Sequence, residues 1–81
     1  MKVTIHRGTR IEAGQSAVSV DGIWLHRYSV YTELVGNRLF HILVDEEQPG
    51  TSYGNGTRIG ASYALKDIRA MMVDHLTPAR T

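Results

Sequence analysis

The sequence predicts an α+β domain: an antiparallel sheet of four to five strands, followed by a single C-terminal helix that packs on one face of the sheet. Three observations predict this class. Short segments in the first three quarters of the chain alternate polar and apolar residues, the period of two that is typical of strands. Dipeptides that favour tight turns separate some of these segments. From Tyr63 to Leu76 the apolar residues recur every three or four positions, as on one face of a helix.

The first strands flank a well-defined turn. Residues 2–6 alternate as a half-buried strand should. Asp21-Gly22 then lies between two further apolar segments. It suits a two-residue type I′ turn, because both central residues of that turn need positive φ. The resulting register has three pairs: Val20 with Ile23, Val18 with Leu25, and Ser19 with Trp24.

The strand after this turn runs long, through residues 23–34, and its alternation changes phase partway along. A bulge near Arg27-Tyr28 would explain that change. Gly36-Asn37 indicates a second hairpin, with Leu34 opposite Leu39 and Tyr31 opposite Ile42. Residues 39–44 are apolar on both faces apart from His41, which is typical of a central strand.

The rest of the chain divides into a loop, a short strand and the helix. Residues 45–56 combine acidic residues, Pro and Gly, which predicts a long exposed loop, and residues 57–59 predict a last short strand. Ser62 is the expected N-cap of a helix over Tyr63–Leu76, which Pro78 ends. The predicted core joins helix and sheet residues: Leu65, Ile68, Met72 and Leu76 with Val3, Ile5, Val18, Val20, Ile23, Leu25, Phe40, Ile42 and Val44.

The 81 residues leave room for one domain, which we assign to residues 1–77, with residues 78–81 as a C-terminal tail. The chain has no cysteine, which excludes a disulfide framework and is typical of the cytosol. The first residues lack the apolar core of a signal peptide, and no apolar run approaches the roughly 20 residues that span a bilayer. We therefore expect a cytoplasmic protein with no membrane partner.

Catalytic and metal-binding patterns are missing from the sequence. None of the four histidines has the spacing of a helical metal-binding pair, so we expect no metal site and no cofactor. The run Asp45-Glu46-Glu47 reads as a solvated turn. A small enzyme would need His41 or His26 within hydrogen-bond reach of Asp45 or Glu46. We expect no catalytic residues and no enzymatic activity.

The aromatic residues are the best candidates for contact with a partner, because five of them are too many to bury in so small a core. Trp, Tyr and Arg are common interface anchors, since they bury a large area. The candidate partner-binding residues lie on the long strand and around the Gly-rich loop: Trp24, His26, Arg27, Tyr28, Tyr53 and Arg58.

Residues 58–69, with the sequence RIGASYALKDIR, resemble the end of the AP2-like DNA-binding modules of phage integrases. In that family a three-stranded sheet precedes a helix that opens with a small or hydroxyl residue. The resemblance implies a sheet that enters the DNA major groove. The matching contact residues would be Trp24, Arg27, Arg38 and Arg58.

In size, layout and lack of catalytic motifs, the chain also resembles the small phage and mobile-element proteins that modulate host complexes, a class that includes anti-CRISPR proteins. That resemblance implies a protein that occupies a surface on a macromolecular complex, in the host cytosol if it is phage-encoded. The formal net charge is only +1, whereas nucleic-acid binders usually show a basic excess. The sequence therefore favours a non-enzymatic binding protein of phage type with a protein complex as partner. DNA binding and a self-associating minor subunit of a larger particle are the alternatives.

Overall fold

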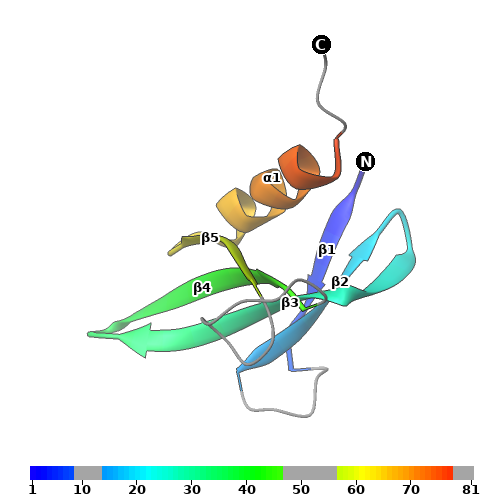
Figure 1. Cartoon of the computed structure of the whole chain (residues 1–81). Helices are drawn as coiled ribbons and strands as arrows, with labels where there is room; N and C mark the ends of the chain where they lie inside the picture. Colours follow the sequence, from blue (N-terminus) through cyan, green and yellow to red (C-terminus); the bar gives the residue numbers. More distant parts are fainter. Residues whose placement is uncertain (9–13, 47–56, 78–81) are drawn as a thin grey trace.

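The structure, a computed structural model, describes residues 1–8, 14–46 and 57–77. It confirms the α+β class: a five-stranded antiparallel sheet is followed by one C-terminal helix (Figure 1). The helix found in the described ranges has 12 residues, too few to cross a bilayer. The predicted tail, residues 78–81, lies outside the described residues.

The five strands form a meander in which each strand pairs with the next along the chain. Their bounds are β1 Val3–His6, β2 Gln15–Val20, β3 Ile23–Val35, β4 Arg38–Asp45 and β5 Thr57–Ser62. Asp21 and Gly22 both have positive φ, 52° and 84°, which confirms the predicted turn between β2 and β3. Four predicted pairs are confirmed: Val20–Ile23, Ser19–Trp24, Leu34–Leu39 and Tyr31–Ile42.

The predicted bulge in β3 is confirmed and is larger than a single extra residue. Ser19 pairs with Trp24, but Ala17 already pairs with Ser29, so residues 25–28 lie opposite Val18 alone. The predicted pair of Val18 with Leu25 is therefore wrong. The bulge changes which residues of β3 face each side of the sheet.

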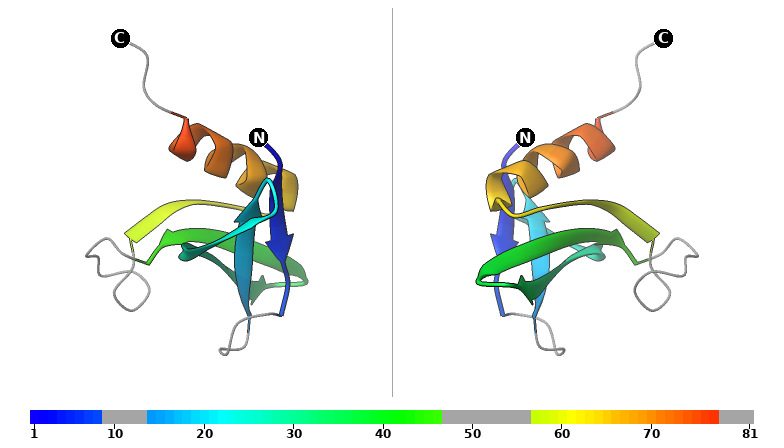
Figure 2. Two further views of the ribbon diagram at one scale, coloured as in Figure 1. Left: turned by 90° about the vertical axis from the view of Figure 1, so that its right-hand side faces the viewer. Right: turned by 90° about the vertical axis from the view of Figure 1, so that its left-hand side faces the viewer.

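The helix α1 (Leu65–Leu76) covers one face of the curved sheet and contacts β1, β4 and β5 (Figure 2). Ile68 and Met72 are its buried residues, as predicted, and Leu65 and Leu76 are half-buried. The core between helix and sheet consists of Val3, Val18, Tyr28, Val30, Leu43, Ile68 and Met72. Ile5, Val20, Leu25 and Leu76 pack against it, also as predicted.

Part of the predicted core lies elsewhere. Val30 faces the helix and pairs with Leu43, so Leu43 also faces the helix. Because side chains alternate along a strand, Ile42 and Val44 lie on the opposite face, where they are nevertheless buried. Phe40 shares that opposite face and is half-exposed, and Ile23 is 67% exposed at the β2–β3 turn.

The helix begins two residues later than predicted. Ser62 is the last residue of β5, and the N-cap position belongs to Ala64. The Ser62 hydroxyl accepts a hydrogen bond from the Ala64 N–H (3.1 Å) and donates one to Asp67 Oδ2 (2.7 Å). Ser62 therefore links the strand to the first turn of the helix without being its cap.

Candidate functional site

Three of the predicted partner-binding residues are exposed. Trp24 is 46% exposed and its ring stacks on that of His6, with centroids 4.1 Å apart and planes at 19°. His26 on β3 and Arg58 on β5 are exposed as well. Tyr53 lies outside the described residues.

Tyr28 does not lie on an accessible surface. It is 6% exposed and belongs to the core, where its ring meets the edge of the His75 ring at 5.5 Å. The bulge is the reason, because it shifts the alternation of β3 so that Tyr28 and Val30 face the helix. The expected placement of Tyr28 at a partner-binding surface is corrected accordingly.

Arg27 is bound to the protein's own Asp45. Its Nε donates to Asp45 Oδ1 and its Nη2 donates to Oδ2, both at 2.9 Å, while its carbonyl accepts the Glu46 N–H. Asp45 is buried at the end of β4, so the prediction that it belongs to a solvated turn is wrong. The charge of Arg27 serves mainly to neutralise a buried carboxylate.

The middle of the sheet face opposite the helix is also buried. Gln15 Nε2 donates to Ser29 Oγ and to the Tyr31 hydroxyl, both at 3.2 Å. The Tyr31 hydroxyl donates to Glu46 Oε1 at 3.1 Å. Because buried polar groups need such partners, this network stabilises the sheet and leaves little of its middle for a partner to contact.

Exposed apolar side chains instead gather at the two ends of β3. The β2–β3 end carries Met1, Ile23 and Trp24, and the β3–β4 end carries Leu34, Val35 and Leu39. Leu34 is 70% exposed and Leu39, its cross-strand partner, is 42% exposed. The second group is the more unusual, since its members lie on a part of the sheet that extends past the neighbouring strands.

We call residues 33–40 the β3–β4 arm. The pairing of β2 with β3 ends at Gln15 and Tyr31, and that of β4 with β5 begins at His41 and Ser62. The arm is therefore a two-stranded ribbon that projects from the five-stranded sheet (Figure 1). Tyr63 packs against the β4 strand of the arm. The centroid of the Tyr63 ring lies 4.8 Å from that of the Phe40 ring and 4.2 Å from the guanidinium carbon of Arg38.

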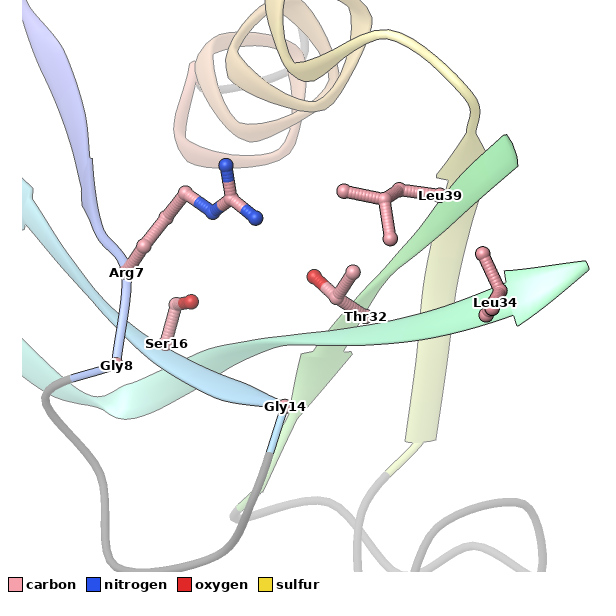
Figure 3. A pocket seen from close by; sticks show the side chains of 7 residues that line it. All are labelled: Arg7, Gly8, Gly14, Ser16, Thr32, Leu34 and Leu39. Carbon is pink, nitrogen blue, oxygen red and sulfur yellow. The ribbon is translucent and has the colours of Figure 1, made fainter. Parts of the chain in front are cut away.

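A pocket of about 620 Å³ lies where the arm joins the sheet, on the same face as the leucine pair. Its lining residues are Arg7, Gly8, Gly14, Ser16, Thr32, Leu34 and Leu39. Figure 3 shows the Arg7 side chain extending from the end of β1 toward Leu39, above Ser16 and Thr32. The pocket thus has a cationic side, a hydroxyl floor and an apolar side.

Arg7 is the charged residue of this lining, and a neutral histidine lies behind it. The Thr32 hydroxyl is hydrogen-bonded to His41 Nδ1 at 2.9 Å. Burial lowers the pKa of His41 from 6.5, and the positive charge of Arg7 lowers it further. His41 is therefore uncharged at neutral pH, and none of the lining residues that the structure describes is acidic.

The residues considered for acid–base chemistry, Asp45 and His41, form structural contacts. Both Asp45 oxygens accept hydrogen bonds from Arg27, and the His41 ring is bonded to Thr32. Within the ranges that the structure describes, no group of three or more His, Cys, Asp or Glu side chains could hold a metal ion. The leucine side and the Arg7 side of the pocket together suit a ligand that has an apolar part and a negative charge.

No family model matches the sequence, and no curated protein or solved structure is significantly similar to the chain. The site is therefore defined by its own geometry. Sequence reasoning placed Leu34 opposite Leu39, but it missed Arg7 and the exposure of the arm. The Gly36-Asn37 turn indicated the hairpin, whereas nothing in the pattern indicated that β2 and β5 end short of it.

Proposed function

We propose that the protein is a non-enzymatic binding module that attaches to a protein partner through the β3–β4 arm. The observation that carries this proposal is the exposure of the cross-strand pair Leu34 and Leu39 on a projecting ribbon. Leaving two leucines in water is unfavourable, and burying them against a partner would contribute roughly 1.5–3 kcal/mol for each side chain fully covered. Val35 and Arg38 add a further apolar side chain and a charge at the same end.

A protein partner fits the charges better than a nucleic acid does. The net charge is +1, and Arg27, one of the four residues of the AP2-like set, is paired with Asp45. Arg38, another of the four, lies over the ring of Tyr63. Phosphate neutralisation supplies much of the affinity for DNA, so a sheet with few available cations is poorly suited to it.

The biological setting belongs to the same proposal. Small size and a projecting apolar arm support a phage-type accessory protein that modulates a host or phage complex by occupying a surface on it, in the cytoplasm. A minor subunit of a larger particle would use the same arm for assembly. The two settings differ in what the arm contacts, which is what the following experiment measures.

A photo-cross-linking amino acid placed at position 34 tests the proposal in the cells that produce the protein. We expect one specific protein adduct, which disappears when Leu39→Thr is added, because threonine keeps the β-propensity and removes the apolar surface. The same amino acid at Lys66, exposed on α1, is the control. An adduct with another copy of the chain would indicate the particle subunit.

Two results would contradict the proposal. One is an equal adduct yield from positions 34 and 66. The other is retention of the protein on duplex DNA that falls steeply with salt and is lost on Arg38→Gln or Arg58→Gln, which would indicate the DNA-binding alternative.

A further inference from the structure

The face of the arm opposite the leucine pair carries a different set of side chains. Val35 pairs directly with Arg38, so the two residues share a face, and Phe40 shares it two positions further along β4. Val35 is 44% exposed, and Arg38 is exposed as well. Leu34 and Leu39 lie on the other face, because side chains alternate along each strand. A partner that covered the leucine pair alone would therefore leave an apolar side chain and a cation of the arm in water.

Tyr63 restricts the position of the Arg38 side chain. Ser62 pairs with His41, so the next residue, Tyr63, stands beside Phe40. Its ring lies 4.8 Å from the Phe40 ring, and the Arg38 guanidinium carbon lies over the Tyr63 ring at 4.2 Å from its centroid. Tyr63 is 41% exposed, so this stack of two rings and a guanidinium reaches the surface of the molecule.

The stacked guanidinium keeps hydrogen-bond donors for an outside ligand. Arginine has five N–H groups in the plane of its guanidinium, and the face of one ring can accept at most one of them. The planar fork matches the two oxygens of a carboxylate. Because the Tyr63 ring already restricts the side chain, Arg38 loses less conformational entropy when a ligand binds.

The charge of Glu33 limits where a carboxylate can bind. Glu33 is exposed on the same face, directly opposite Phe40 and further from the hairpin turn than Arg38. A carboxylate placed beside Phe40 would meet this like charge. Val35, which is opposite Arg38 at the turn, is uncharged. The favourable place for a carboxylate is therefore the tip of the arm, next to an apolar side chain.

We propose that the arm inserts between two walls of its protein partner, one apolar against Leu34 and Leu39, the other with a carboxylate bound to Arg38. This inference rests on the proposed function and specifies the chemistry of the partner. Residues 33–35, at about 3.3 Å each, give the arm a length of about 10 Å, which is the depth of cleft that it requires. The pair of opposite charges would fix the orientation of the arm in the cleft. One cation held on a ring suits a single carboxylate better than the row of phosphates along a duplex.

The protein that the adduct of position 34 identifies is the probe, and its affinity for the full chain is measured at low and at high salt. We expect Arg38→Gln to weaken binding about tenfold, between the effects of losing an exposed and a buried charge pair, and to reduce the salt dependence. Arg38→Lys should weaken binding about threefold, since an ammonium keeps the charge but not the planar fork. Lys66→Gln removes an exposed cation from α1, away from the arm, and should leave the affinity unchanged. Thermal melts of the free variants confirm that each one folds.

Zero-length coupling identifies the carboxylate directly. In the complex of the Arg38→Lys variant, a water-soluble carbodiimide activates the partner's carboxylate. The introduced amine then displaces the activating group as a urea, which leaves an amide bond between the two chains. Digestion and mass spectrometry should find position 38 joined to an Asp or Glu of the partner, whereas the amine of Lys66 should not couple to the partner. Replacing the identified acid by lysine should weaken binding of the native chain, and Arg38→Glu should restore binding to that partner variant.

Two further measurements test the walls and the role of Tyr63 as a positioning residue. The photo-cross-linking amino acid at position 35 should label a different segment of the same partner from that labelled at position 34, because the two positions face opposite ways. Tyr63→Leu should make Arg38→Gln less costly to binding, since the guanidinium is then no longer held by a ring, whereas Tyr63→Phe should keep the full cost.

Equal affinity of the native chain and Arg38→Gln, or labelling of one segment from both positions, would overturn the inference. Coupling of position 38 to a nuclease-sensitive product would overturn it as well, because the ligand would then be a nucleic acid. The proposed function fails separately. If Leu39→Thr removes the adduct of position 34 but Arg38→Gln leaves the affinity unchanged, the arm binds a protein through its leucine face alone. If position 34 gives no specific protein adduct, the proposed function and the inference both fail.

Discussion

Replacing Arg27 by methionine should destabilise the fold strongly, because the substitution leaves the Asp45 carboxylate buried and without its bidentate partner. In the native structure two hydrogen bonds of 2.9 Å join the groups, and the Asp45 side chain is 2% exposed while that of Arg27 is 40% exposed. Removing one partner of a fully buried pair costs about 3–5 kcal/mol. Because Arg27 is partly exposed, water can replace some of its contacts, and we expect about 2–3 kcal/mol.

That loss is large for this chain, since 81 residues correspond to a stability of about 4–12 kcal/mol. Urea denaturation followed by circular dichroism should show the midpoint falling by about 2–3 M, at a slope of roughly 1 kcal/mol per M. The control is the double variant Arg27→Met with Asp45→Leu, which removes both charges and should recover most of the stability. The reasoning is refuted if Arg27→Met costs less than about 0.5 kcal/mol, or if the double variant is no more stable than the single one.

Three further outcomes follow from the packing. The free energy of unfolding should fall as the pH drops below about 6.5. In that range the unfolded chain binds a proton at His41, whereas burial lowers the pKa of His41 in the folded protein, so that it binds the proton only at lower pH. Between pH 7.5 and 5.5 the urea midpoint of His41→Asn should therefore depend less on pH than that of the native protein. Gly60→Ala should lower the free energy of unfolding by about 1–2 kcal/mol, since the added Cβ would lie 2.6 Å from Met71 Sδ. In thermal melts the double variant with Met71→Ala should lose less stability than the sum of the two single losses. Met72→Ala should cost about 2–5 kcal/mol by opening a cavity in the core, whereas Lys66→Ala on the exposed side of α1 should stay within about 0.5 kcal/mol.

The parts of the fold that the sequence predicted are those set by local rules. Asp21-Gly22 and Gly36-Asn37 determine two hairpins, because turn geometry selects residue types within a few positions. The apolar spacing of α1 predicted Ile68 and Met72 as core residues in the same way. Each of these features depends on neighbours in the sequence.

The parts that were missed depend on distant residues. Residues 39–44 are apolar on both faces, so their sequence could not show that Leu43, and not Ile42 or Val44, faces the helix. The β3–β4 hairpin pairs Val30 with Leu43, and the bulge between β2 and β3 brings Val30 to the same face as Val18, which faces the helix. Asp45 is buried because Arg27, 18 positions earlier, reaches it across the same strand pair.

The exposure of the β3–β4 arm is likewise a property of three strands and not of one. From the sequence pattern alone, Leu34 and Leu39 in a long hairpin would be expected to lie in the core. They are exposed because β2 pairs no further than Tyr31 and β5 no further than His41. Sequence patterns locate the end of each strand only to within a few residues. They therefore cannot predict that β3 and β4 extend past β2 and β5 by a few residues, which is the difference that defines the candidate site.

Stability and binding are consequently separated along β3. Its 13 residues, at about 3.3 Å each, span about 43 Å, close to the 41 Å long dimension of the molecule. The bulge, the Arg27–Asp45 pair and the packing of Tyr28 on α1 lie in its first half, and the arm forms its last three residues and their partners on β4. Substitutions that are far apart and share no contacts have additive effects on stability. Leu34→Thr should therefore change binding without the loss of folding that Arg27→Met causes, and a partner that released both variants equally would have to contact the bulge and not the arm.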